Sequence, residues 1–174
     1  LVHTAGHIER AKREGKLGVL LGFQNATHLN RDIRNIEFFH NLGIRQIQLT
    51  YNELNALGAG STERRDVGLS DFGVACVEKM NELGILVDVS HCGVQTTLDA
   101  IEVSKKPILF SHSNCRALND NPRCKSDEQI RKLAAKGGTG WPPFVIDSVK
   151  RATRTWKSTS RSTAPASSMR SSTS

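Results

Sequence analysis

The sequence predicts an α/β fold in which about four strand-helix units form part of a TIM-like (β/α) barrel. Apolar runs alternate with segments of helical periodicity between residues 17 and 138. Runs such as residues 85–89, which are apolar except at Asp88, are typical of strands buried on both faces of a parallel sheet. Glycine patterns that bind dinucleotide phosphates are absent, which favours a partial barrel over an open nucleotide-binding sheet.

The first two units are expected between residues 17 and 84. The first strand is predicted at residues 17–23, and the helix after it has apolar residues on one face and ends before Gly43. The second strand, residues 44–50, alternates apolar and polar side chains. A longer helix follows, with Ser70 as its N-cap and Gly84 at its end.

The third and fourth units follow the same order. A strand is predicted at residues 85–90 and a short helix at residues 96–103. The fourth strand, residues 108–111, leads to a helix that opens with a capping box at Ser126 and ends at Gly137. Crossovers of this kind give parallel strands, as the barrel requires.

Two of the predicted strands end in the dipeptide Ser-His, at His91 and His112. The carboxyl ends of parallel strands meet at one edge, where active sites of such folds are built. Neutral imidazole nitrogens are good zinc ligands, so the pair suggests a metal site. A histidine in this position is also often a hydrogen-bonded structural residue, and spacing alone leaves the two interpretations equal. Asp88 within the third strand could orient a ligand or cap a backbone group.

The basic charge is concentrated at one end of the chain. The formal net charge is +7, and residues 141–174 hold six Lys and Arg against one Asp. From residue 157 to 174, eleven of eighteen residues are Ser or Thr, so we predict that residues 141–174 are a non-homologous, disordered basic tail beside a barrel domain of residues 1–140. Nucleic-acid binding is not expected, and no apolar stretch is long enough to cross a bilayer.

Five segments in order make the chain recognisable: residues 43–52, 68–73, 80–91, 110–113 and 121–123. Together they resemble the membrane (renal) dipeptidase family of zinc metallopeptidases, especially its bacterial members, over about residues 16–140. The resemblance implies a barrel of the metal-dependent hydrolase type, in which a zinc-activated water attacks the peptide bond of a dipeptide.

The resemblance also assigns roles to single residues. His91 and His112 match ligands of one zinc, and Arg123 matches the arginine that holds the substrate carboxylate. Gln24 stands where renal members place a glutamate that bridges two zinc ions, so a two-zinc centre is doubtful. Tyr51 stands where they carry a histidine that polarises the scissile carbonyl; a phenol can still donate one hydrogen bond there.

The chain also departs from the family pattern. The family's first metal pair, His-x-Asp, is not found before Leu17, and the chain does not begin with Met, so we expect a piece of a longer protein. Such a piece should be poorly stable and nearly inactive. The alternatives are a degenerate, non-catalytic barrel that binds a metal or ligand, or an amidohydrolase that acts on another small amide.

The expected partners also follow from the resemblance. The substrate would be a small dipeptide, and a homodimer is possible for a full-length form. Family members are membrane-anchored or cytoplasmic, and a cytoplasmic location is expected for a bacterial-type member.

Overall fold

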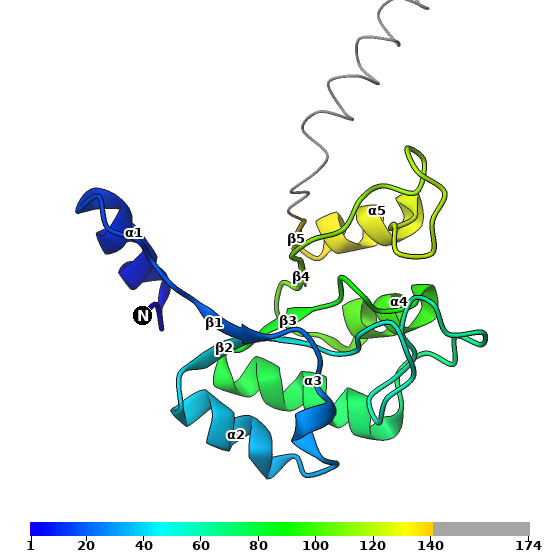
Figure 1. Ribbon diagram of the computed structural model, residues 1–174, viewed down its shortest axis with the longest axis horizontal. Helices are drawn as coiled ribbons and strands as arrows, with labels where there is room; N and C mark the ends of the chain where they lie inside the picture. The colour runs from blue at the N-terminus through cyan, green and yellow to red at the C-terminus, as the bar shows by residue number, and fades with distance from the viewer. Residues whose placement is uncertain (141–174) are drawn as a thin grey trace, which may run out of the picture. The chain divides into compact units, whose positions relative to one another are not determined.

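The computed structural model describes residues 1–140, which fold around a parallel sheet of five strands (Figure 1). The strands lie side by side in sequence order, and every neighbouring pair is parallel. This order is that of a barrel wall, whereas a doubly wound sheet reverses direction at a switch point. The structure therefore confirms the predicted α/β partial barrel. The strands are β1 (Leu21–Phe23), β2 (Ile44–Gln48), β3 (Leu86–Asp88), β4 (Leu109–Phe110) and β5 (Thr139–Gly140).

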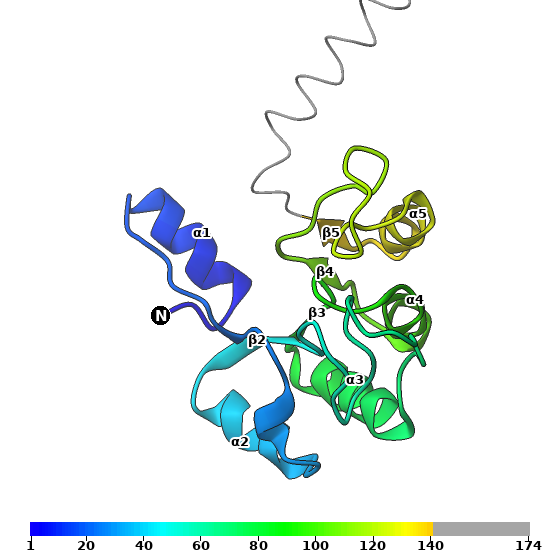
Figure 2. The same cartoon turned by 45° about the vertical axis from the view of Figure 1, so that its right-hand side comes forward.

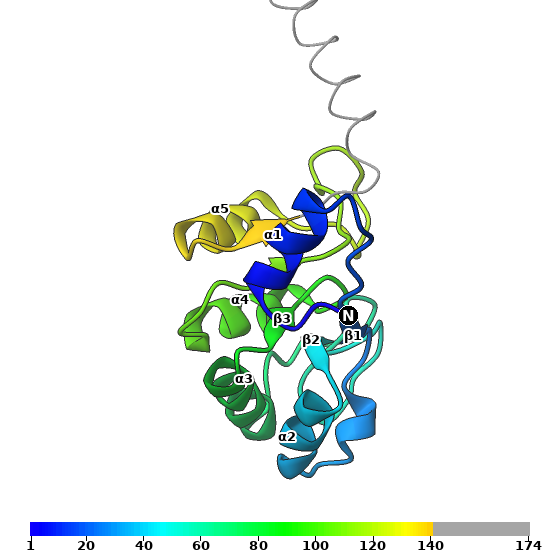
Figure 3. The ribbon, with the colours of Figure 1, turned by 90° about the vertical axis from the view of Figure 1, so that its left-hand side faces the viewer.

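Helices follow the strands in alternation and pack against one another in chain order. Contacts join α2 to α3, α3 to α4 and α4 to α5, while α2 and α3 also pack on the strands β2 and β3 (Figures 1 and 2). Helix α1 lies apart from this layer in Figures 1 and 2, stands toward the viewer in Figure 3, and buries none of its residues. The helices are α1 (Ala5–Arg13), α2 (Arg34–Asn41), α3 (Asp71–Leu83), α4 (Val94–Val103) and α5 (Asp127–Ala135), with a short 3₁₀ turn at Thr27–Leu29.

The predicted helix ends are confirmed by their hydrogen bonds. The Ser70 hydroxyl accepts from the backbone N–H of Gly73, and Gly84 after α3 has a φ of 70°. Ser126 and Gln129 form the expected capping box at the start of α5. These caps fix where each helix begins and ends, and so where the next strand can enter the sheet.

The two faces of the sheet have different surroundings. Ile47 and Val87 are paired neighbours that belong to the buried core under the helices. Gln46 and Leu86, the adjacent pair, point to the opposite face, where Leu86 is 41% exposed. Within residues 1–140 this second face, the inner side of a barrel wall, is less well covered. The polar site lies along its carboxyl edge.

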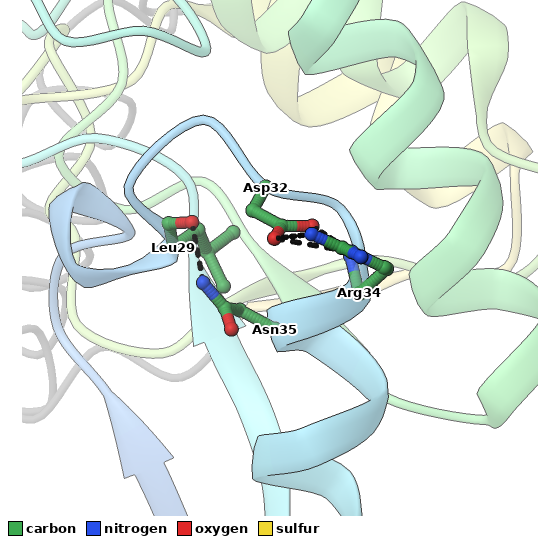
Figure 4. Close-up of polar contacts among 4 residues, drawn as sticks. All are labelled: Leu29, Asp32, Arg34 and Asn35. Carbon is green, nitrogen blue, oxygen red and sulfur yellow. Dashed lines mark hydrogen bonds and ion pairs between the residues drawn. The ribbon is translucent and has the colours of Figure 1, made fainter.

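A local polar cluster sets the start of α2 (Figure 4). The Asp32 carboxylate accepts hydrogen bonds from the backbone N–H of Arg34 at 2.9 Å and from the guanidinium of the same residue. The Asn35 side chain donates to the Leu29 carbonyl at 2.9 Å. These contacts join residues close in sequence, so they stabilise the turn rather than the packing of distant elements.

Two elements were not predicted from the sequence, and one prediction lies outside the structure. Helix α1 is polar on average and has no buried residue, and β5 is only two residues long. The first strand is also shorter than predicted, beginning at Leu21. The predicted tail, residues 141–174, lies outside the described residues. In the part that is described, no helix is both long and apolar enough to cross a membrane.

Candidate metal centre

The polar residues singled out in the sequence meet at the carboxyl edge of the sheet. Gln24 follows β1, Tyr51 follows β2, His91 follows β3 and His112 follows β4. Because all these strands are parallel, their carboxyl ends share one edge. The side chains come from segments far apart in the sequence, and the register of the strands brings them together.

The two histidines face one another through the same ring nitrogen. His91 Nε2 and His112 Nε2 are 2.9 Å apart, and the amide nitrogen of Gln24, Nε2, lies 3.1 Å from His112 Nε2. His91 is only 6% exposed. Three side chains that carry nitrogen or oxygen donors thus converge on one point.

The hydrogen bond at the far side of the His91 ring fixes its proton. His91 Nδ1 lies 2.7 Å from the Asn52 side-chain oxygen, which can only accept. Assigned from this contact, the proton is on Nδ1 and the lone pair is on Nε2. His91 therefore presents an unprotonated nitrogen toward His112.

Asp88 is the buried centre that joins the two strand ends. It is 0% exposed. Its Oδ1 accepts from the backbone N–H of Ser90 at 2.9 Å, from the Ser90 hydroxyl at 2.6 Å and from the backbone N–H of Ser111 at 3.3 Å. Its Oδ2 accepts from Gln46 Nε2 at 2.7 Å and from the Ser111 hydroxyl. A buried carboxylate with this many donors is tightly held.

The surroundings keep both imidazoles neutral. Burial, together with the positive charge of Arg123 and the nearby His112, lowers the pKa of His91 to about 3, although Asp88 acts in the opposite direction. Burial also lowers the pKa of His112. A neutral imidazole is the form that binds a metal ion.

Arg123 reaches the same edge from the loop between β4 and α5. Its guanidinium donates to the Ser90 carbonyl and, at 3.3 Å, to the His112 carbonyl. Burial lowers its pKa, yet no shift of this kind removes the charge of a guanidinium at neutral pH. These two bonds orient the guanidinium beside the histidines and leave further N–H groups for a ligand.

Tyr51 covers one side of His91. The two rings are stacked with centroids 4.1 Å apart and planes 20° apart, and Tyr51 is 43% exposed. The phenol ring therefore lies between His91 and solvent.

The donor set suits a metal ion but is incomplete. In a tetrahedral zinc site with bonds of about 2.0–2.1 Å, two imidazole nitrogens stand about 3.3 Å apart. The observed 2.9 Å between His91 Nε2 and His112 Nε2 is close to this value, so both nitrogens can contact one cation. Within residues 1–140, no group of three or more His, Cys, Asp and Glu side chains is arranged to hold a metal. Two imidazoles and one amide oxygen are what these residues can offer.

Lys125 is a buried residue next to the site that sequence reasoning missed. It is 2% exposed and its ammonium donates to the Cys92 carbonyl at 2.9 Å and to the Thr97 hydroxyl at 3.3 Å. Burial lowers its pKa to about 8. It ties the loop that carries Arg123 to the backbone just after His91. No sequence pattern marks it.

One other histidine also has a structural role. The His28 ring packs on Phe23 and Phe39, with centroids 3.7 and 5.1 Å away, and burial lowers its pKa. This ring is part of an aromatic cluster beside α2 and is not near the strand-end histidines.

A parallel sheet with polar residues gathered at its carboxyl edge is typical of barrel enzymes, and comparison with known proteins names the family. The model of the membrane dipeptidase family, peptidase family M19, matches residues 1–155. The chain therefore belongs to the membrane dipeptidase family, which confirms the resemblance seen in the sequence.

Two curated relatives agree with this. An uncharacterized dipeptidase of Schizosaccharomyces pombe is 31% identical over 144 residues, covering 80% of this chain and 35% of the relative. The dipeptidase verJ of Clonostachys rogersoniana is 31% identical over 155 residues, covering 88% of this chain and 39% of the relative. The chain thus spans between a third and two fifths of the length of these relatives.

Solved structures share the fold. An amidohydrolase from Pseudomonas aeruginosa superposes with a TM-score of 0.76 at 42% identity, covering 80% of this chain and 42% of that one. A metallo peptidase from Rhodobacter sphaeroides, liganded with a phosphinate mimic of the dipeptide L-Ala-D-Ala, has a TM-score of 0.75 at 22% identity, covering 80% and 41%. The latter likeness supports the fold alone.

Proposed function

We propose that this chain carries part of the active site of a metal-dependent dipeptidase, with His91 and His112 as ligands of one metal ion. The observation that carries the proposal is the pair of Nε2 atoms 2.9 Å apart, beside an oriented guanidinium. Membership of the membrane dipeptidase family supports the reaction class. A bound zinc ion would lower the pKa of a water molecule and supply the hydroxide that attacks the peptide carbonyl.

The residues of this chain would hold and orient the substrate. Arg123 would bind the C-terminal carboxylate of a dipeptide through the N–H groups that its two carbonyl contacts leave free. Tyr51 would donate a hydrogen bond to the scissile carbonyl from its place over His91. Gln24 places its amide nitrogen 3.1 Å from His112 Nε2, and a turn of the amide group would offer its oxygen to the metal instead.

A metal-binding experiment on the 174-residue chain tests the first step. We expect zinc to bind, and His91→Ala and His112→Ala each to weaken binding at least about tenfold because each removes one ligand. His28→Ala is the matched control, because its ring packs on Phe23 and Phe39 rather than on His91 or His112. Equal zinc affinity in all the variants would contradict the proposal.

Activity is best tested in a complete barrel. The aligned segment of the P. aeruginosa amidohydrolase, 42% identical, can be replaced by residues 16–140 of this chain. In such a chimera Arg123→Met should raise KM for free dipeptides about 10–100-fold and leave KM for dipeptide amides unchanged, since only the former carry the carboxylate. Arg116→Met, in the same loop, is the control. Equal effects on both substrates would contradict the role of Arg123.

A second candidate is a degenerate barrel that binds a metal without hydrolysis. It is favoured by Gln24, a neutral amide where renal members have a bridging carboxylate. A chimera that binds zinc through His91 and His112 yet hydrolyses no dipeptide would select this alternative.

A further inference from the structure

The Ser111 hydroxyl lies between a carboxylate and an imidazole. Its oxygen contacts Asp88 Oδ2 on one side and lies 2.6 Å from His112 Nδ1 on the other. Asp88 is the last residue of β3 and Ser111 directly follows β4, so the chain of contacts crosses from one strand to the next. Metal-binding histidines are usually oriented by a direct contact with a carboxylate or carbonyl, whereas here a hydroxyl stands between the two groups.

The direction of the hydrogen bonds follows from counting protons. A carboxylate accepts only, so the single hydroxyl proton of Ser111 is donated to Asp88. The Ser111 oxygen then has only lone pairs to offer His112, and the bond at 2.6 Å requires the proton to be on His112 Nδ1. The His112 Nε2 lone pair is left facing His91.

Asp88 cannot change its orientation without losing buried bonds. Its Oδ1 accepts from two backbone N–H groups, those of Ser90 and Ser111, which have fixed positions. Its Oδ2 is therefore always the oxygen presented to the Ser111 hydroxyl and to Gln46. We call the hydrogen bonds from Asp88 through Ser111 to His112 the relay. Its direction is thus set by the backbone at the ends of β3 and β4.

We propose that Asp88, acting through Ser111, is a positioning residue that fixes His112 in the Nδ1-protonated tautomer and so presents its Nε2 lone pair to a divalent metal ion. The metal part of this inference rests on the proposed function. His91 is set independently, because its Nδ1 contacts Asn52 from the loop after β2. The two histidines of one site are thus controlled by separate elements, and His91 serves as an internal reference for His112.

The variant Asp88→Asn reverses the relay. The backbone N–H groups of Ser90 and Ser111 require the new asparagine amide to keep its oxygen on their side. Its NH₂ group then faces the Ser111 hydroxyl and the Gln46 side chain, and the Gln46 amide can rotate to accept from it. Ser111 would then accept from the new amide and donate to His112 Nδ1, which forces the imidazole proton onto Nε2. A change from aspartate to asparagine beside a histidine can alter the tautomer while preserving geometry.

Two readouts on the 174-residue chain test the proposal. In the metal-free chain, nitrogen-15 NMR of the imidazoles should show His112 protonated on Nδ1 in the wild type and on Nε2 in Asp88→Asn, with His91 unchanged. In competition with a chromogenic chelator, the affinity for zinc ion alone should fall about 100-fold in Asp88→Asn and about 10-fold in Ser111→Ala. Ser111→Thr, which keeps the hydroxyl, should retain affinity within about threefold.

Ser104→Ala is the matched control, since it removes a buried serine hydroxyl that bonds Asn81 and the Lys106 carbonyl, away from the site. It should leave both readouts unchanged. A His112 tautomer that stays the same in Asp88→Asn, or wild-type zinc affinity in Ser111→Ala, would overturn the proposal. If Asp88→Asn does not fold, Ser111→Ala decides the question alone. A His112 that stays protonated only on Nδ1 in Ser111→Ala would also overturn the proposal. A wild-type chain that binds no zinc would contradict the proposed function, while the tautomer comparison would still decide the relay.

Discussion

Asp88 and Asp32 accept hydrogen bonds in similar local patterns but in opposite surroundings. Each takes a backbone N–H from the second residue after it, Ser90 in one case and Arg34 in the other. Asp32 stays near the surface and its cluster joins residues close in sequence (Figure 4). Asp88 is fully buried and also binds groups from β2 and β4. Water can replace the partners of Asp32, whereas nothing can replace those of Asp88.

This difference shows which polar cluster determines the candidate site. A buried acceptor with donors from several strands fixes their relative positions, because each lost bond leaves a desolvated group unpaired. The exposed cluster contributes little beyond the shape of one turn. The three predictions that follow test this contrast, and they are ordered by the size of the expected effect.

Removing the buried carboxylate should have the largest effect. Asp88→Ala leaves two serine hydroxyls and two backbone N–H groups without their acceptor, and we expect the free energy of unfolding to fall by at least about 3 kcal/mol. Urea unfolding followed by circular dichroism measures it. Asp32→Ala is the control and should change stability much less. Comparable losses in the two variants would refute the contrast.

Lys125 extends the comparison to cations. Arg34 is 87% exposed at its side chain and paired with a carboxylate, whereas Lys125 is buried and bonded only to neutral oxygens. Burial lowers the pKa of Lys125 from its ordinary value of 10.5 to about 8 in the folded chain. Between these values the unfolded chain holds the proton and the folded chain releases it. The stability contributed by this residue therefore rises with pH across that window and is lowest below about pH 8.

The variant Lys125→Met isolates this contribution. At about 1.4 kcal/mol per pKa unit, the wild type should gain up to about 3 kcal/mol relative to the variant between pH 7.5 and 10.5. Urea unfolding at several pH values measures the difference in free energy of unfolding between the wild type and the variant. The contributions of other titrating groups are common to both chains and cancel in this difference. Lys132→Met, a half-exposed lysine on α5, should show no such change against the wild type. A difference that stays constant with pH would show that Lys125 is not desolvated.

The contrast between buried and exposed groups also explains what the sequence could predict. Apolar runs, the Ser70 and Ser126 caps and glycine at helix ends are local signals, and they located the strands and helices to within a few residues. Helix α1 is polar on average and buries no residue, and it was not predicted. The strand-end histidines were visible because their position follows from strand direction alone.

The connections around those histidines could not be predicted in the same way. The relay from Asp88 to His112 depends on the register of β3 against β4, which pairs residues far apart in the chain. Lys125 stands in a loop before a helix, where a lysine is normally exposed, but here its ammonium lies over the Phe110 ring and donates to the Cys92 carbonyl. The sequence therefore predicted where these residues lie on the strands and loops, but not which residues they bond to or pack against.

Gln24 provides the mildest test, because it is the exposed one of the three candidate ligands. Its amide lies 3.1 Å from His112 Nε2, and a carboxylate at the same place would offer a charged oxygen to a cation without burying it. We therefore expect Gln24→Glu to raise the affinity of the 174-residue chain for zinc about tenfold, or about 1.4 kcal/mol, measured by chelator competition at 0.15 M salt.

Asn25→Asp separates ligation from simple charge. It adds the same charge one residue along the chain, where the Asn25 side chain contacts Asn55 instead of the histidines. At about 0.15 M salt an unligated surface charge is largely screened beyond about 8 Å, so this variant should raise zinc affinity less than about twofold. Equal gains in both variants would mean that the exposed edge attracts a cation only through its charge. A gain confined to Gln24→Glu would place residue 24 among the ligands, next to the imidazole that the buried carboxylate orients.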